Sequence, residues 1–118
     1  MANSPVLTCV QLAQRFGEFL AAGDYEGAWE LLTREAQLVN PPADLKSNTE
    51  GMHTYAPGPI AEVKAMDRIL EDWPAKQDGD VASVYVALVG GNFCEAVYLT
   101  VAHEHGQLRI RDIEWGRP

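Results

Sequence analysis

Two long apolar runs separated by a glycine turn constrain this chain more than any other feature. The runs are VASVYVALV, residues 81–89, and FCEAVYLTVA, residues 93–102. Both are rich in β-branched residues and free of proline and glycine, which is typical of strands. Gly90-Gly91-Asn92 supplies a turn between them, and Glu104-His105-Gly106 leads into a third run, Leu108 to Trp115. Three strands joined by short turns predict an antiparallel meander.

The third run carries apolar residues on both parities. Leu108 and Ile110 share one parity, whereas Ile113 and Trp115 share the other. A regular strand cannot bury both pairs on one face. We therefore expect a β-bulge near Arg111-Asp112, and we expect Ile113 and Trp115 to anchor the last strand by burial.

The first half has helical periodicity. One amphipathic stripe has the spacing i, i+3, i+4, i+7, i+10 and i+11 and consists of Cys9, Leu12, Ala13, Phe16, Phe19 and Leu20. Gly23 is a stop signal, and Asp24 has the features of an N-cap for a second helix. Short helices are expected over Arg34 to Val39 and over Leu45 to Met52.

Helices first and a meander second predict an α+β fold with N-terminal helices packed on an antiparallel sheet. The length of 118 residues suits a single domain, 1–118. His53 to Ile60 is expected to be a loop. Ile60 to Trp73 fits helical spacing only loosely and could equally open a first strand.

Charge and composition limit the classes of binding partner that we expect. Asp and Glu outnumber Lys and Arg by 17 to 9, for a formal net charge of -8. Nucleic-acid binding needs a basic footprint, so we expect no nucleic-acid partner. No apolar stretch is long enough to span a membrane, and the N-terminus lacks the pattern of a signal peptide. These features favour a cytoplasmic protein, with Cys9 and Cys94 as buried free thiols.

One segment resembles a known family. FGEFLAAGDYEGAWELLT, residues 16–33, is similar to the first two helices of nuclear transport factor 2-like (NTF2-like) domains of the SnoaL and ketosteroid isomerase type. DWPAKQ (72–77) and IEWGRP (113–118) resemble an uncharacterised bacterial branch of that superfamily. The resemblance implies a curved sheet wrapped around the first helix as a cone with a pocket at its mouth. It also implies a homodimer through the outer sheet face, and a strand rather than a helix over Val63 to Trp73.

Glu95 is the first candidate for chemistry. It shares a strand face with Phe93, Val97, Leu99 and Val101, which is the more apolar face and so the expected core or pocket side. A carboxylate desolvated near a strand end can act as a general base. Alternatively, Glu95 lies at the rim, solvated or paired with Arg109 or Arg111.

Two further candidates for catalysis are Asp112 and His53. Asp112 and Glu114 share a parity, and paired carboxylates can divide acid and base roles, although they could simply pair with the neighbouring arginines. His53 lies with Tyr55 in the loop that could cover a pocket, or that could be a loop only. His103 and His105 supply too few ligands for a metal, so we expect neither a metal nor a cofactor.

The aromatic residues expected to line a pocket are Phe16, Phe19, Trp29, Tyr55 and Tyr85. Helix-to-sheet packing explains the first three equally well. The function classes that remain open are a binder of a small hydrophobic or amphipathic molecule, a cofactor-free isomerase or dehydratase using a strand carboxylate, and a dimeric adaptor.

Overall fold

The structure is a computed structural model that describes residues 5–52, 60–70, 76–91 and 94–116. Within these ranges the elements are α1 (Pro5–Ala22), α2 (Tyr25–Glu30), α3 (Arg34–Val39), α4 (Pro42–Met52), β1 (Ile60–Leu70), β2 (Asp80–Gly90), β3 (Cys94–Glu104) and β4 (Gln107–Gly116). The four strands form one open antiparallel sheet in the order β1-β2-β3-β4. This confirms the α+β class, the meander and a strand from Ile60 onward.

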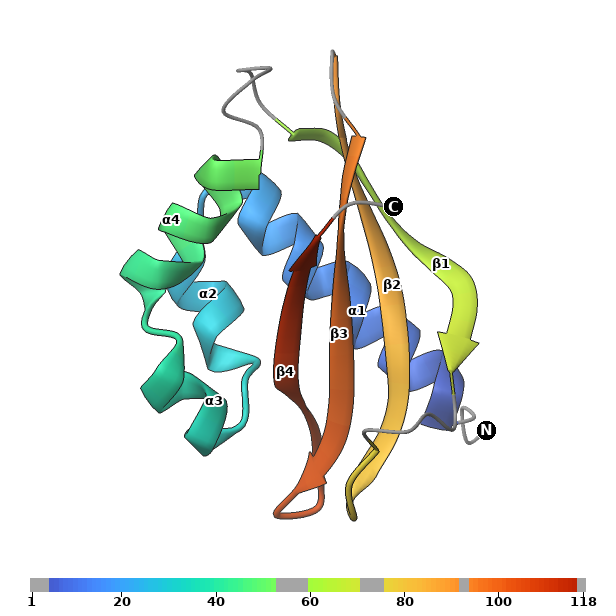
Figure 1. Cartoon of the computed structure of the whole chain (residues 1–118). Coiled ribbons are helices and arrows are strands. Elements are labelled where there is room, and N and C mark those ends of the chain that lie inside the picture. The colour runs from blue at the N-terminus through green and yellow to red at the C-terminus, as the bar shows by residue number, and fades with distance from the viewer. Residues whose placement is uncertain (1–4, 53–59, 71–75, 92–93, 117–118) are drawn as a thin grey trace.

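The helices divide into two groups. α1 crosses one face of the sheet, while α2, α3 and α4 gather beside β4 (Figure 1). The expectation that the N-terminal helices all pack on the sheet is therefore correct only for α1. We call the face that α1 covers the inner face and the opposite one the outer face.

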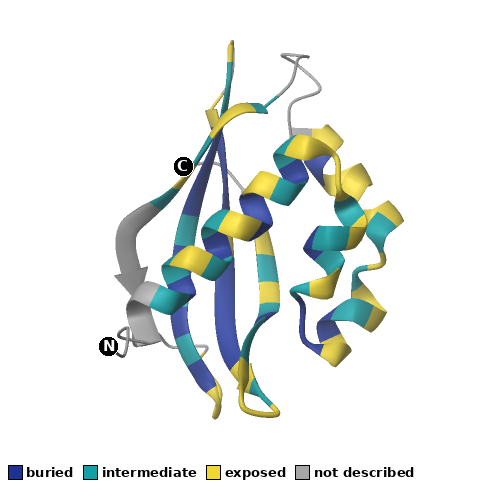
Figure 2. Cartoon of the chain, turned by 180° about the vertical axis from the view of Figure 1, so that it is seen from behind, coloured by how far each residue is buried: buried dark blue, intermediate teal, exposed yellow. Residues whose placement is uncertain are grey.

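The apolar stripe of α1 is buried as the sequence predicts. Cys9, Ala13, Phe16 and Leu20 are at most 2% exposed, and the opposite side of the helix faces solvent (Figure 2). α1 comes so close to the sheet that a Cβ at Gly17 would lie 2.5 Å from Cγ1 of Val63. Glycine is therefore required at this crossing.

The turn between α1 and α2 also follows the prediction. Gly23 has a φ of 75°, which suits a glycine that ends a helix. The Asp24 carboxylate then accepts a hydrogen bond of 3.0 Å from the Gly27 N–H and caps α2. These two residues fix the angle at which α2 leaves α1.

The predicted bulge is present in β4. Thr100 pairs with Asp112 and Val101 pairs with Ile110, so Arg111 is the additional residue. The bulge allows Ile110 and Ile113 to face the core together: Ile110 is fully buried, and Ile113 packs against the core from a half-buried position.

Both edges of the sheet are partly covered. At the β4 edge, the Ile110 N–H donates to the Leu31 carbonyl (2.9 Å) and the Thr33 N–H donates to the Ile110 carbonyl (2.8 Å). At the β1 edge, the Gln14 side chain accepts from the Ala65 N–H (2.7 Å) and donates to the Val63 carbonyl (2.8 Å). Gln14 thus takes the place of a neighbouring strand's amide and blocks part of an edge open to aggregation.

Candidate functional site

Glu95 is a buried carboxylate on the inner face of the sheet. It is the second residue of β3, pairs with Leu88 of β2 and is only 1% exposed. The predicted face is confirmed, and a solvated position at the rim is wrong. The partners considered for it are engaged elsewhere: Arg109 donates to the Glu30 carbonyl and the Gln107 side chain, and Arg111 donates to Asp80.

The residues that neighbour Glu95 on its own face of the sheet are apolar. Leu88, Val97 and Leu99 share this face and are fully buried. A buried charged or polar group is costly unless it is hydrogen-bonded. Within the part of the chain that the structure describes, no buried side-chain nitrogen or oxygen lacks a hydrogen-bond partner, and Glu95 is among the residues that interact. Glu95 is therefore a satisfied polar group held within an apolar layer.

Asp112 lies on the opposite face of the sheet. It pairs with Thr100 and is exposed, as is Glu114, which pairs with Tyr98. The two carboxylates share a face as predicted, but that face is the outer one. Asp112 and Glu95 therefore lie on opposite sides of the sheet, and the structure does not bring these two candidate bases together.

Tyr85 is likewise an outer-face residue. Its ring meets that of Tyr98 edge to face, with centroids 5.1 Å apart and planes at 74°. Val84 and Val86 on either side of it point to the core. Tyr85 therefore does not line a pocket on the inner face, in contrast to the prediction.

The other aromatic residues that were predicted to line one pocket lie in different parts of the fold. Phe16 is fully buried in the core, whereas Phe19 packs where α1 meets α2, under the Arg15 guanidinium at 5.6 Å. Trp29 lines an open groove beside α3. His53 and Tyr55 lie outside the described residues.

The two cysteines differ in environment. Cys9 is buried in the core, and burial raises the pKa of its thiol to about 11. Cys94 is exposed at the start of β3, so the prediction that it is buried is wrong. Its parity matches Tyr98, which places it on the outer face.

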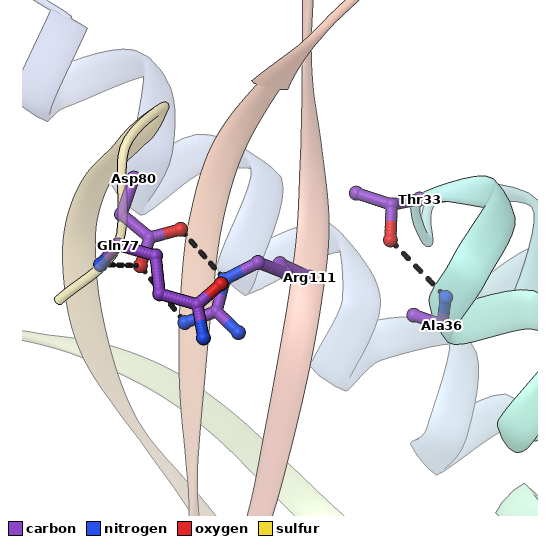
Figure 3. Close-up of polar contacts among 5 residues, drawn as sticks. All are labelled: Thr33, Ala36, Gln77, Asp80 and Arg111. Atoms are coloured by element: carbon purple, nitrogen blue, oxygen red, sulfur yellow. Dashed lines mark hydrogen bonds and ion pairs between the residues drawn. The ribbon is translucent and has the colours of Figure 1, made fainter. Parts of the chain in front are cut away.

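An ion pair between Asp80 and Arg111 is the main polar feature that the sequence did not predict. Arg111 reaches from β4 across β3 to Asp80 on β2, with Nε 2.6 Å from Oδ1 and Nη2 2.8 Å from Oδ2 (Figure 3). The Gln77 N–H donates to the same carboxylate at 2.9 Å. The Asp80 side chain is fully buried and that of Arg111 is 27% exposed.

Electrostatics favour the charged form of this pair. Burial by itself would raise the pKa of Asp80, but the hydrogen bonds from Arg111 and Gln77, together with the positive charge of Arg111, lower it below its usual value. The pKa of Arg111 is raised, chiefly by its hydrogen bond to Asp80. Asp80 lies next to a register shift in β2, and Arg111 lies at the bulge in β4. The ion pair therefore links the irregular positions of these two strands, with β3 between them.

Comparison with protein-family models, with curated proteins and with solved structures finds no match to this chain. None of the helices in the described part is long and apolar enough to span a membrane. In the same ranges, no three His, Cys, Asp or Glu side chains come together as a metal site.

Proposed function

We propose that this chain is an NTF2-like protein that binds a small amphipathic molecule on the inner face of its sheet, with Glu95 as the polar anchor. The observation that carries the proposal is a carboxylate, 1% exposed, on an otherwise apolar strand face. Carboxylates are among the residues most rarely buried in full, so a buried one has a structural or a functional reason. The order of helices followed by a meander, with one long helix across the sheet, supports the family.

The chemistry of the anchor defines the class of ligand. The oxygens of a carboxylate group accept hydrogen bonds, so we expect the headgroup to donate one, as a hydroxyl or an ammonium does. Leu88, Val97 and Leu99 surround Glu95 with hydrocarbon but are fully buried in the core, so the hydrocarbon body of a ligand would contact them only where the core opens to admit it. The other strand carboxylates considered, Asp112 and Glu114, are exposed on the other side of the sheet, so neither assists Glu95. We therefore favour binding over a cofactor-free isomerase or dehydratase with Glu95 as its general base.

The test uses three probes with the same alkyl chain: octylamine, 1-octanol and octanoate. Binding to the full chain is measured by isothermal titration calorimetry. We expect octylamine and octanol to bind, and Glu95→Gln to weaken octylamine by about tenfold, since a charge-assisted hydrogen bond is lost. Asp112→Asn is the matched control, because it removes a strand carboxylate from the exposed face.

Three results would contradict the proposal. They are the absence of saturable octylamine binding, equal binding by Glu95→Gln and the native chain, and an equal loss in Asp112→Asn. Circular dichroism of each variant confirms that the fold is intact. A Glu95→Gln protein that is folded, more stable and unchanged in binding would assign Glu95 a purely structural role.

A second proposal concerns the outer face, which we infer to pair two copies of the chain as a homodimer. Tyr98 is 37% exposed on this face, beside Tyr85 of β2 and the exposed Glu114 of β4, and the small residue Ala96 precedes it on the same face. An exposed aromatic on a strand surface suits an isologous contact. Light scattering after size exclusion should give a dimer that Tyr98→Glu converts to monomers, while Leu38→Glu on α3 leaves it intact. A native chain that stays monomeric at high concentration would refute the dimer.

A further inference from the structure

A groove lies between α3 and the β3–β4 hairpin, at the far end of β3 from Glu95. Its volume is about 440 Å³, and its apolar wall is formed by Trp29, Leu32 and Leu38. We call it the α3 groove. Its volume falls in the range of roughly 300–1,000 Å³ that is usual for small-molecule sites. The proposed ligand site at Glu95 does not involve it.

The walls of the α3 groove are held in place by hydrogen bonds. The Trp29 indole N–H donates to the Gln37 carbonyl, and the Gln37 amide donates back to the Trp29 carbonyl, both at 3.1 Å. The Arg34 backbone N–H donates to the two carboxylate oxygens of Glu104 at 3.0 and 3.3 Å. The first contact fixes α2 to α3, and the second fixes α3 to the end of β3. A ligand would therefore meet a largely preformed surface, which lowers the cost of binding.

The exposed apolar surface at the groove is unusual for this molecule. Leu38 is 80% exposed and Val39 beside it is 68% exposed, the two highest values among the exposed large hydrophobic residues of the described ranges. Leu38 lines the groove directly. Single exposed apolar residues need no explanation, whereas two adjacent ones beside a groove favour an interaction site there.

Two arginines supply positive charge at the same place. Arg34 and Arg109 both line the groove, in a chain of net charge -8. Arg109 donates to two neutral groups, the Glu30 carbonyl and the Gln107 amide oxygen. No hydrogen bond or ion pair joins the Arg34 guanidinium to another described residue. Within the described residues, neither arginine is thus neutralised by a carboxylate in direct contact, although Glu104 lies nearby with its oxygens accepting from the Arg34 backbone N–H.

We propose that the α3 groove binds a small amphipathic monocarboxylate. The carboxylate lies between Arg34 and Arg109, where guanidinium groups offer paired N–H donors. The hydrocarbon body packs on Trp29, Leu32 and Leu38. A phosphate ion lacks the apolar body, and a cationic amphiphile is repelled by the arginines, so both bind more weakly. This selectivity is opposite to that proposed for Glu95.

The test follows the Trp29 indole N–H resonance by two-dimensional NMR during titration with octanoate. The resonance is assigned from its loss in Trp29→Phe. We expect a saturable shift with octanoate and little shift with octylamine or inorganic phosphate. Arg34→Gln should weaken octanoate by about tenfold, and Leu38→Asn should also weaken it. Arg15→Gln, an arginine on α1 away from the groove, is the control and should bind within about twofold of the native chain.

The inference is overturned by a shift that does not saturate, by equal shifts with octylamine, or by unchanged affinity in folded Arg34→Gln. Glu95→Gln keeps this test separate from the proposed function. Octanoate binding at the α3 groove should be unaffected by that substitution, and loss of it would show that the groove is not an independent site.

Discussion

Replacing Arg111 with methionine tests whether the ion pair between Arg111 and Asp80 stabilises the fold. The substitution keeps an apolar stem but removes two hydrogen bonds to the fully buried Asp80 carboxylate, so that among the described residues the Gln77 N–H remains as its donor. Breaking a buried pair costs about 3–5 kcal/mol because one charge is left uncompensated. Because Arg111 is 27% exposed, water can partly solvate the Asp80 carboxylate once the guanidinium is removed. We therefore expect the free energy of unfolding to fall by about 2–3 kcal/mol.

The assay is urea unfolding of the native chain, Arg111→Met, Asp80→Asn and the double variant. The double variant should recover part of the loss, since it leaves no buried charge without a partner. The stabilising role of the ion pair would be refuted if Arg111→Met lowered the free energy of unfolding by less than about 0.5 kcal/mol. It would also be refuted if the losses of free energy in the two single variants added exactly in the double variant.

The same pair predicts the response to acid. The pKa of Asp80 in the folded chain lies below its usual value, so its contribution to stability is present above the usual value of 3.8 and is lost as pH falls through the folded pKa. Arg111→Met removes the main groups that lower this pKa. The variant should therefore lose less of its remaining stability than the native chain on acidification below about pH 4. Equal acid sensitivity of the two proteins would argue against this assignment.

Three further predictions concern packing, the sheet edge and the thiols. Gly17→Ala should lower the free energy of unfolding, measured by heat or urea, by about 1–3 kcal/mol, because its Cβ would clash with β1. Gly51→Ala on α4 is the control and should be neutral or stabilising, because its Cβ meets no atom within 4 Å. Equal changes in stability for the two variants would contradict the close approach of α1 to the sheet. Gln14→Leu should lower the free energy of unfolding by about 1–2 kcal/mol and increase aggregation on heating, as measured by light scattering. An unchanged melting temperature would show that the β1 edge does not need the Gln14 side chain. A thiol reagent at neutral pH should modify Cys94 quickly and Cys9 only on unfolding, because burial raises the pKa of Cys9 to about 11; rapid reaction of both would place Cys9 at the surface.

Local patterns predicted much of this fold. The stripe on α1, the cap at Asp24, the strands and the bulge at Arg111 each depend on residues that are near in sequence. The bulge was predictable because two apolar pairs of opposite parity had to face one core. The family-based expectation that Val63 onward forms a strand was also confirmed as far as Leu70.

Non-local features were not predictable in the same way. In β2 the set Ala82, Val84, Val86 and Leu88 is hardly more apolar than the set containing Tyr85, so the sequence alone did not show which face is inner. Asp80 and Arg111 are 31 positions apart and meet only through the register of three strands. The α3 groove likewise depends on where α3 lies against β4. Cys94 could have been placed correctly, because it shares the parity of Tyr98.

The most direct test of the central claim is the ¹³C resonance of the Glu95 side-chain carboxyl, assigned through Glu95→Gln, during titration with octylamine. If the inner face holds an amphipathic ligand anchored at Glu95, this resonance shifts and saturates with the calorimetric affinity, while the exposed Glu114 on the outer face stays unchanged. An unchanged Glu95 resonance, or one that moves no more than that of Glu114, would contradict the claim.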